Sequence, residues 1–171
     1  MVGGLTFQFR VAVDRDIVAL VQLYADCALT LGPQVYSAEQ VAAWASFGAD
    51  SAAFRHYIFS ATTWVATTPA VDGIAGFCGV DDSGEVHSLY VHPRLTRQGL
   101  GSKLLGHAMA QARAAGVQRF SAWATPFSRP VFARAGLGLV AAVTETYQGV
   151  PFERYRVETP AAAARNAAQN G

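Results

Sequence analysis

One stretch near the middle of the chain constrains the fold more than any other, because its pattern changes period across a glycine-bearing loop. Residues 85–91 alternate and are rich in branched and aromatic side chains, as strands are. After His92 and Pro93, apolar residues recur every four positions until Gly116, which indicates an amphipathic helix of about four turns. We therefore predict a strand that runs through a glycine loop directly into a helix.

The loop has features of an anion site. Glycines at 99 and 101 let the backbone approach a ligand closely, and the first N–H groups of a helix have no partner inside it. These N–H groups point outward with the positive end of the helix dipole, which suits a diphosphate. Arg97 adds a positive charge and Ser102 a hydroxyl. Tight packing of strand against helix also explains the glycines, so the loop alone does not decide between the two.

Composition indicates one globular domain. The 171 residues are 51% hydrophobic and 15% charged, which is enough apolar material for a substantial core. We assign residues 1–159 to this domain. Residues 160–171 are rich in alanine and polar side chains, and we expect them to form a disordered tail.

Charge and hydropathy exclude several classes of partner. A net charge of +1 provides no basic field for nucleic acid or an anionic membrane. No stretch approaches the ~18 uninterrupted apolar residues of a membrane helix, so we expect a cytoplasmic protein. The two cysteines, Cys27 and Cys78, lie far apart without a CxxC motif, and we expect neither a disulfide nor a metal site.

The other segments predict an α+β chain. A strand at 5–13 precedes a helix that Asp14 or Asp16 can cap, and Ser37 can cap a second helix. A third helix is expected at 51–59. Further strands are expected at 64–68, 74–80, 85–91 and 118–124, followed by a short helix at 128–135 and a hairpin of 137–147 with 151–158.

In this context the Val91-x-Pro93 sequence, the Arg-Gln-Gly-Leu-Gly loop and the helix resemble the acetyl-CoA motif of the GNAT superfamily, in its small stand-alone bacterial form. The order of elements from about Leu5 to Val157 is similar too. The resemblance implies the GNAT fold, a mixed and mostly antiparallel central sheet of six to seven strands flanked by helices. It also implies cofactor contacts: backbone bonds from Leu89, Tyr90 and Val91 to the pantetheine arm, and pyrophosphate binding by Arg97, Gln98, Gly99, Leu100, Gly101 and Ser102.

Two positions depart from the family pattern. Thr96 stands where Arg or Gln is usual; Arg97 either compensates or is a solvated loop charge. Phe132 stands where many members have a tyrosine four residues before a glycine, and a phenyl ring cannot protonate a departing thiolate. We expect Phe132 to pack on the pantetheine arm and Ser128 to lie on the cofactor side. The acid is left open among water and three tyrosines, Tyr90, Tyr147 and Tyr155.

Direct acetyl transfer needs a neutral amine and a group that accepts its proton. Period-two geometry puts Glu85, His87 and Leu89 on one face of their strand, and Val86, Ser88 and Tyr90 on the other. We assign His87 as the base, since an ordinary imidazole has a pKa near ~6.5, and Glu85 as a group that orients it or relays through water. A half-buried packing histidine is the alternative.

The early helices carry many aromatic residues, most of them expected in the core. We expect Tyr36 and Trp44 to face the acceptor, which then has an apolar or cationic portion. The sequence thus predicts an N-acetyltransferase that moves the acetyl group of acetyl-CoA to a primary amine of a small molecule or peptide by direct attack. A non-catalytic acyl-CoA-binding or sensing domain is the alternative. The acceptor, the acyl-chain preference, and the choice between monomer and homodimer stay open.

Overall fold

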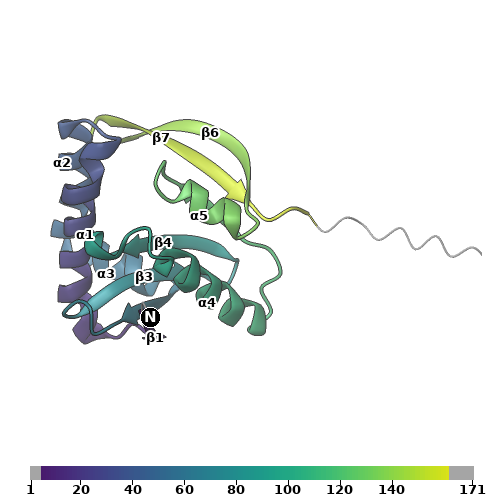
Figure 1. Ribbon diagram of the computed structural model, residues 1–171. Helices are drawn as coiled ribbons and strands as arrows, with labels where there is room; N and C mark the ends of the chain where they lie inside the picture. The colour runs from purple at the N-terminus through teal and green to yellow at the C-terminus, as the bar shows by residue number, and fades with distance from the viewer. Residues whose placement is uncertain (1–4, 162–171) are drawn as a thin grey trace, which may run out of the picture.

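The computed structural model describes residues 5–161, and within them seven strands form one sheet in the order β1-β2-β3-β4-β5-β7-β6 (Figure 1). All neighbouring strands are antiparallel except β4 and β5, which are parallel. The predicted α+β class and mostly antiparallel mixed sheet are confirmed. The strands are β1 Gln8–Val11, β2 Thr62–Thr67, β3 Ile74–Val80, β4 Glu85–Val91, β5 Ser121–Ala124, β6 Gly138–Tyr147 and β7 Val150–Glu158.

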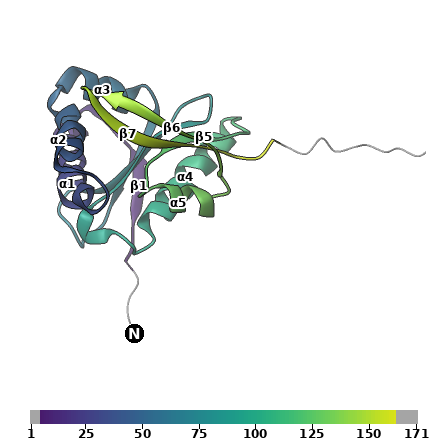
Figure 2. The same cartoon turned by 90° about the horizontal axis from the view of Figure 1, so that it is seen from above.

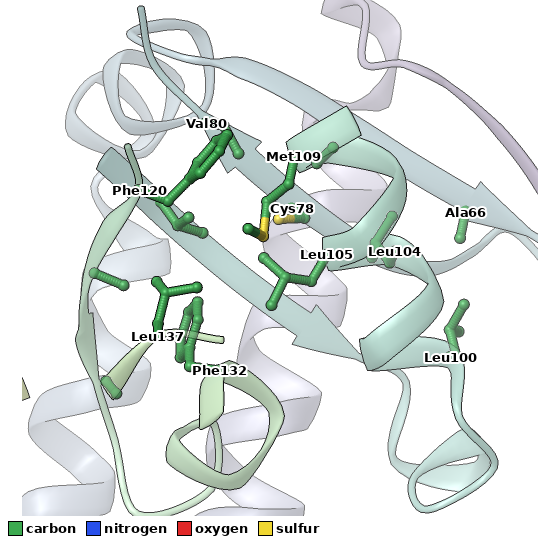
Figure 3. Close-up of a cluster of buried hydrophobic side chains, with 14 of the residues drawn as sticks. Ala66, Cys78, Val80, Leu100, Leu104, Leu105, Met109, Phe120, Phe132 and Leu137 are labelled. Carbon is green, nitrogen blue, oxygen red and sulfur yellow. The ribbon is translucent and has the colours of Figure 1, made fainter. Parts of the chain in front are cut away.

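Helices cover both faces of the sheet (Figures 1 and 2). One face carries α1 (Ile17–Leu31), α2 (Ala38–Ser46) and α3 (Ser51–Phe59), with Leu20, Phe54 and Phe77 among the buried side chains between them. The other carries α4 (Leu100–Ala114) and α5 (Arg129–Arg134), whose core includes Leu104 and Phe120 (Figure 3). Below, these are called the α1–α3 face and the α4–α5 face.

One predicted cap is confirmed and the other is wrong. Ser37 accepts a hydrogen bond from the Gln40 N–H, and the Gln40 side chain accepts one from the Ser37 N–H, so α2 begins with a capping box. Asp16 precedes α1 but does not cap it. Its carboxylate accepts bonds from the Arg10 guanidinium and from the Val13 N–H, which come before the helix in the chain, so it is not available to the first N–H groups of α1.

The last hairpin turns where the sequence predicted. The β6–β7 hairpin turns at Gln148 and Gly149, both with positive φ (50° and 81°). The first strand and β5 are shorter than predicted, because β1 pairs with β2 only at residues 8–11 and β5 pairs only from Ser121 onward. The expected tail lies mostly at 162–171, outside the described residues. No helix within 5–161 is both long and apolar enough to cross a bilayer.

Strands β4 and β5 separate soon after they meet. They pair only through Glu85 with Ser121 and Val86 with Ala122. Beyond these pairs β5 continues alongside β7, whereas β4 keeps β3 as its single neighbour. The sheet therefore divides here, and in the part of the chain that the structure describes no strand pairs with this edge of β4 from residue 87 to its end.

Candidate active site

The free edge of β4 presents backbone groups. The His92 N–H donates to the Ala75 carbonyl (2.8 Å), and hydrogen-bonded pairs alternate along an antiparallel ladder. By this alternation, Tyr90 bonds toward β3, while Leu89 and Val91 turn their N–H and C=O groups toward the separation from β5. The prediction that all three backbones serve a ligand is therefore wrong for Tyr90, which the β3 ladder engages.

A β-bulge changes the side-chain pattern of β4. Gly79 pairs with Ser88 and Val80 with Val86, so His87 is an extra residue without a partner on β3. The alternation shifts there: Val86 packs in the core of the α4–α5 face, whereas Tyr90 packs on the α1–α3 face. The predicted grouping of Val86 with Tyr90 is wrong for this reason. The bulge also places His87 at the point where β4 leaves β5.

The loop after β4 leads into the N-terminus of α4 with unpaired donors. Arg97 and Gly99 have positive φ (62° and 82°), which turns the chain sharply into the helix. The first backbone bond into the helix is from the Lys103 N–H to the Gly99 carbonyl. Among residues 5–161, the N–H groups of Leu100, Gly101 and Ser102 have no hydrogen-bond acceptor, as expected for the first turn of a helix. This array of donors is arranged as predicted, and its binding of an anion stays a prediction.

Helix α5 packs beside this array. A Cβ placed on Gly101 would lie 3.6 Å from the Val91 side chain and 3.8 Å from that of Val131 on α5. The helix starts of α4 and α5 therefore meet next to the free end of β4. Arg129 lies over the Tyr155 ring at 4.9 Å, and the two line a surface hollow of about 320 Å³ beside α5.

Two predicted cofactor residues have other contacts. Phe132 is 3% exposed and packs with Leu105 and Leu137 in the core of the α4–α5 face (Figure 3). Its ring is turned inward, which leaves it no free face for the expected contact with a pantetheine arm. The Ser128 hydroxyl accepts a bond from the Thr125 N–H (3.0 Å) and lies 3.2 Å from the Thr125 hydroxyl. Ser128 thus closes the turn that follows β5.

His87 is held by an acidic residue that sequence reasoning missed. Its Nε2 lies 2.7 Å from Oδ2 of Asp81, at the start of the β3–β4 turn. The other oxygen of Asp81 accepts three bonds: from the N–H and hydroxyl of Ser83 and from the Glu85 N–H. Burial opposes the charged form of Asp81, but bonds from Ser83 and His87 outweigh it and lower its pKa to about 2.

Glu85 does not orient His87, contrary to the prediction. Its two carboxylate oxygens lie 2.9 and 2.8 Å from Nη1 of Arg156 on β7, and the Ser121 hydroxyl donates to it at 2.6 Å. Arg156 in turn lies over the Trp123 ring at 5.3 Å. Glu85 therefore joins β4, β5 and β7 where the first two strands begin to separate.

The fold matches known acetyltransferases. Comparison with curated proteins gives no match, but the sequence matches the acetyltransferase (GNAT) domain family over residues 33–159. The chain belongs to the GNAT family. It is an acyltransferase of the N-acetyltransferase type, as the resemblance implied.

Solved structures agree with this fold. A GCN5-related N-acetyltransferase from Rhodopseudomonas palustris superposes with a TM-score of 0.85 at 23% identity, covering 93% of this chain and 98% of that one. PaiA N-acetyltransferase from Thermoplasma acidophilum, solved with coenzyme A, gives 0.71 at 14% identity over 91% and 99%. The ribosomal-protein-S18-alanine N-acetyltransferase of Escherichia coli gives 0.68 at 14% identity over 94% and 98%.

In this GNAT chain, the α1–α3 face carries an aromatic cluster beside the free edge of β4. Trp44 lies 6.3 Å from Tyr90 and 5.8 Å from Tyr36, measured between ring centroids, and Tyr36 lies 5.6 Å from Phe152 on β7. Phe127, after β5, completes the set within 6.4 Å of both Tyr36 and Trp44. The predicted residues Tyr36 and Trp44 are thus brought together, half-buried, with rings from three other segments.

Two tyrosines of this region, Tyr36 and Tyr57, hold their hydroxyl protons firmly. The Tyr57 hydroxyl donates to the His87 carbonyl at 2.9 Å. Burial raises the pKa of Tyr57, and burial raises that of Tyr36 to about 12; the nearby charge of Arg154 acts in the opposite direction on both. Tyr147 sits at the turn of the β6–β7 hairpin, where its hydroxyl accepts from Gln148.

The β6–β7 hairpin is joined to α2. The Gln40 side chain donates to the Pro151 carbonyl (2.7 Å), and the Ser46 hydroxyl bonds the Gln148 side chain (3.1 Å). The predicted acceptor side of this GNAT chain is therefore bounded by segments about a hundred residues apart. Sequence spacing alone did not show this, because no local pattern links α2 to β7.

Proposed function

We propose that this GNAT enzyme transfers the acetyl group of acetyl-CoA to a primary amine of a small molecule or peptide, by direct attack with His87 as base. The observation that carries the proposal is the separation of β4 from β5. It puts His87, the free edge of Leu89 and Val91, and the unpaired N–H groups of α4 along one continuous path.

The residues present fit acetyl-CoA. The N–H groups of Leu100, Gly101 and Ser102 suit a pyrophosphate, with Arg97 as an added charge. The backbone groups of Leu89 and the Val91 N–H suit the amide-bearing pantetheine arm, whereas the Val91 carbonyl already accepts a bond from the Cys27 thiol at 3.2 Å. Bound acetyl-CoA supplies an activated thioester as the acetyl donor. Phe132 is left out of this assignment, because its ring belongs to the core.

His87 is suited to accept the proton of the amine. An ionised carboxylate only accepts hydrogen bonds, so Asp81 fixes the hydrogen of the neutral imidazole on Nε2. The other ring nitrogen, Nδ1, then presents its lone pair. Asp81 also stabilises the imidazolium that forms when Nδ1 takes up a proton. We therefore add Asp81 as a positioning residue.

Glu85 has a different part in this proposal. Arg156 and Ser121 occupy both of its oxygens, which leaves its lone pairs engaged. We propose that Glu85, paired with Arg156, fixes the start of the strand separation. The Tyr57 hydroxyl, bound to the His87 carbonyl, helps hold the bulge in place.

The function is tested by following free thiol released from acetyl-CoA over a panel of primary amines, together with calorimetry of CoA binding. We expect turnover with at least one amine, and His87→Ala should lower kcat by about 10² to 10⁴ with unchanged CoA affinity. Binding of CoA without turnover of any amine would favour the non-catalytic alternative. No binding of CoA at millimolar concentration would contradict both.

A further inference from the structure

Arg154 is an arginine whose donors are only partly used. It lies on β7 between Phe152 and Arg156, and alternation along the strand puts these three side chains on the same face. Phe152 contacts Tyr36. The intervening Tyr155 packs toward the α4–α5 face, so Arg154 projects to the α1–α3 face, beside the aromatic cluster.

Within residues 5–161, one side of the Arg154 guanidinium has no partner. Its Nη1 donates to Glu145 on β6 at 3.3 Å. Its Nε is buried and, among the described residues, has no hydrogen-bond acceptor; none is found for Nη2 either. A buried N–H without an acceptor is costly, so its persistence calls for an explanation. The Nε and Nη2 donors form the planar fork that binds a carboxylate with two parallel hydrogen bonds.

The fork lies near the proposed chemistry. Phe152, two residues before Arg154 on the same face of β7, lies 5.6 Å from Tyr36 between ring centroids, and Tyr57 donates to the His87 carbonyl. The charge of Arg154 acts to lower the pKa of both tyrosines. Two residues further along the same face of β7, Arg156 binds Glu85. Since alternate residues of a strand are about 7 Å apart, a group bound at Arg154 lies within the length of a small molecule from Glu85.

We propose that Arg154 binds the carboxylate of the acceptor, so that the substrate is an amine of the amino-acid class. This inference rests on the proposed function, because it names the acceptor of the same site. The carboxylate binds Nη2 and, once the side chains that cover Nε turn aside, Nε as well, and the amine points toward His87. Glu145 holds the remaining nitrogen and fixes the plane of the guanidinium.

The first experiment measures binding and needs no turnover. The probes are N-acetylglycine, N-acetyl-L-leucine and N-acetyl-L-phenylalanine, each with its primary amide, titrated into the CoA-saturated protein by calorimetry. We expect at least one acid to bind about 10- to 100-fold more tightly than its amide. Equal binding of every acid and amide, including no binding of either, would overturn the inference.

Variants of Arg154 test whether its Nε and Nη2 donors cause the preference for the acid over the amide. Arg154→Gln should abolish the preference for the acid and leave CoA affinity unchanged, whereas Arg154→Lys, which keeps the charge without the planar fork, should restore only part of it. Glu145→Gln should keep the preference, because it leaves Nε and Nη2 in place. Arg119→Gln, on an exposed arginine, is the matched control. A preference that survives in Arg154→Gln would refute the assignment even if Arg154→Lys fails to fold.

The second experiment measures turnover of free amino acids against their amides. A preference for acids in kcat/KM that disappears in Arg154→Gln supports both proposals. Thiol release from amines without any preference for a carboxylate overturns the inference alone. Binding of the acids without thiol release overturns the proposed transfer reaction but still supports a carboxylate site at Arg154.

Discussion

Replacing Asp81 by asparagine tests how the base is held, because the structure predicts which way the new amide turns. Oδ1 of Asp81 accepts bonds from two backbone N–H groups, those of Ser83 and Glu85, and from the Ser83 hydroxyl. In Asp81→Asn the amide oxygen keeps that position, since an NH₂ group there would face three donors. The NH₂ group then faces His87, where an acceptor stood before.

This reversal changes the tautomer of His87. A donor opposite Nε2 requires Nε2 to accept, so the ring hydrogen moves to Nδ1 and no lone pair is left for the amine. We expect kcat to fall by about 10² to 10⁴, the range for loss of a general base. Asp81→Ala imposes no tautomer and loses only the alignment, so we expect a fall of about 10-fold. The asparagine variant, although closer in shape, should be the less active.

The assay is steady-state thiol release at saturating acetyl-CoA, with calorimetry to show that CoA affinity is kept. Ser83→Ala is the control, because it removes one of the three bonds at Oδ1 and leaves both backbone donors. Equal activity of Asp81→Asn and Asp81→Ala would refute the tautomer argument. Wild-type activity in both would remove Asp81 from the mechanism.

Three further predictions concern the cofactor loop, the β3–β4 turn and a buried thiol. Alanine at Gly101 meets Val131 only at van der Waals distance, so the melting temperature should hold, whereas Gly101→Glu should weaken CoA binding at least tenfold in calorimetry by repelling the phosphates. Gly84 has φ of 89°, and a Cβ there would collide with the Arg119 carbonyl; Gly84→Ala should lose about 3 kcal/mol in urea unfolding, and an unchanged midpoint would contradict the packing. Burial raises the pKa of Cys27 to about 12, so at pH 8 it is a neutral thiol and should react with iodoacetamide only on unfolding; rapid labelling of the folded protein would disprove this.

The sequence predicted those elements whose ends carry their own local chemistry. Strands β3 and β4 have the predicted bounds, because a glycine-bearing turn separates two runs of branched and aromatic residues. The cap at Ser37 was predicted because it depends on a residue next to the helix start, whereas the reciprocal bond from Gln40 that completes the capping box was not predicted. The glycine loop and α4 were found for the same reason, and the free N–H groups follow from helix geometry.

The site could be predicted only in part, because its decisive contacts join distant segments. A period-two pattern continues smoothly through residues 85–91, so nothing in it shows the one-residue bulge at His87. The partner of Glu85 is Arg156, 71 residues away, and only the pairing order of the sheet brings them together. Phe132 was placed by resemblance at the cofactor, whereas packing in the α4–α5 core determines where its ring lies.

The joining of α2 to the β6–β7 hairpin has a consequence for how this enzyme can diversify. In the proposed function, one continuous stretch, from β4 through the loop to α4, recognises the nucleotide, whereas the opposite wall comes from α2 and the last hairpin, joined by Gln40 and Ser46. Substitutions in the hairpin can therefore alter which amine is accepted while the acetyl donor stays the same. A new specificity requires matched changes in two short segments, and the rest of the scaffold need not change.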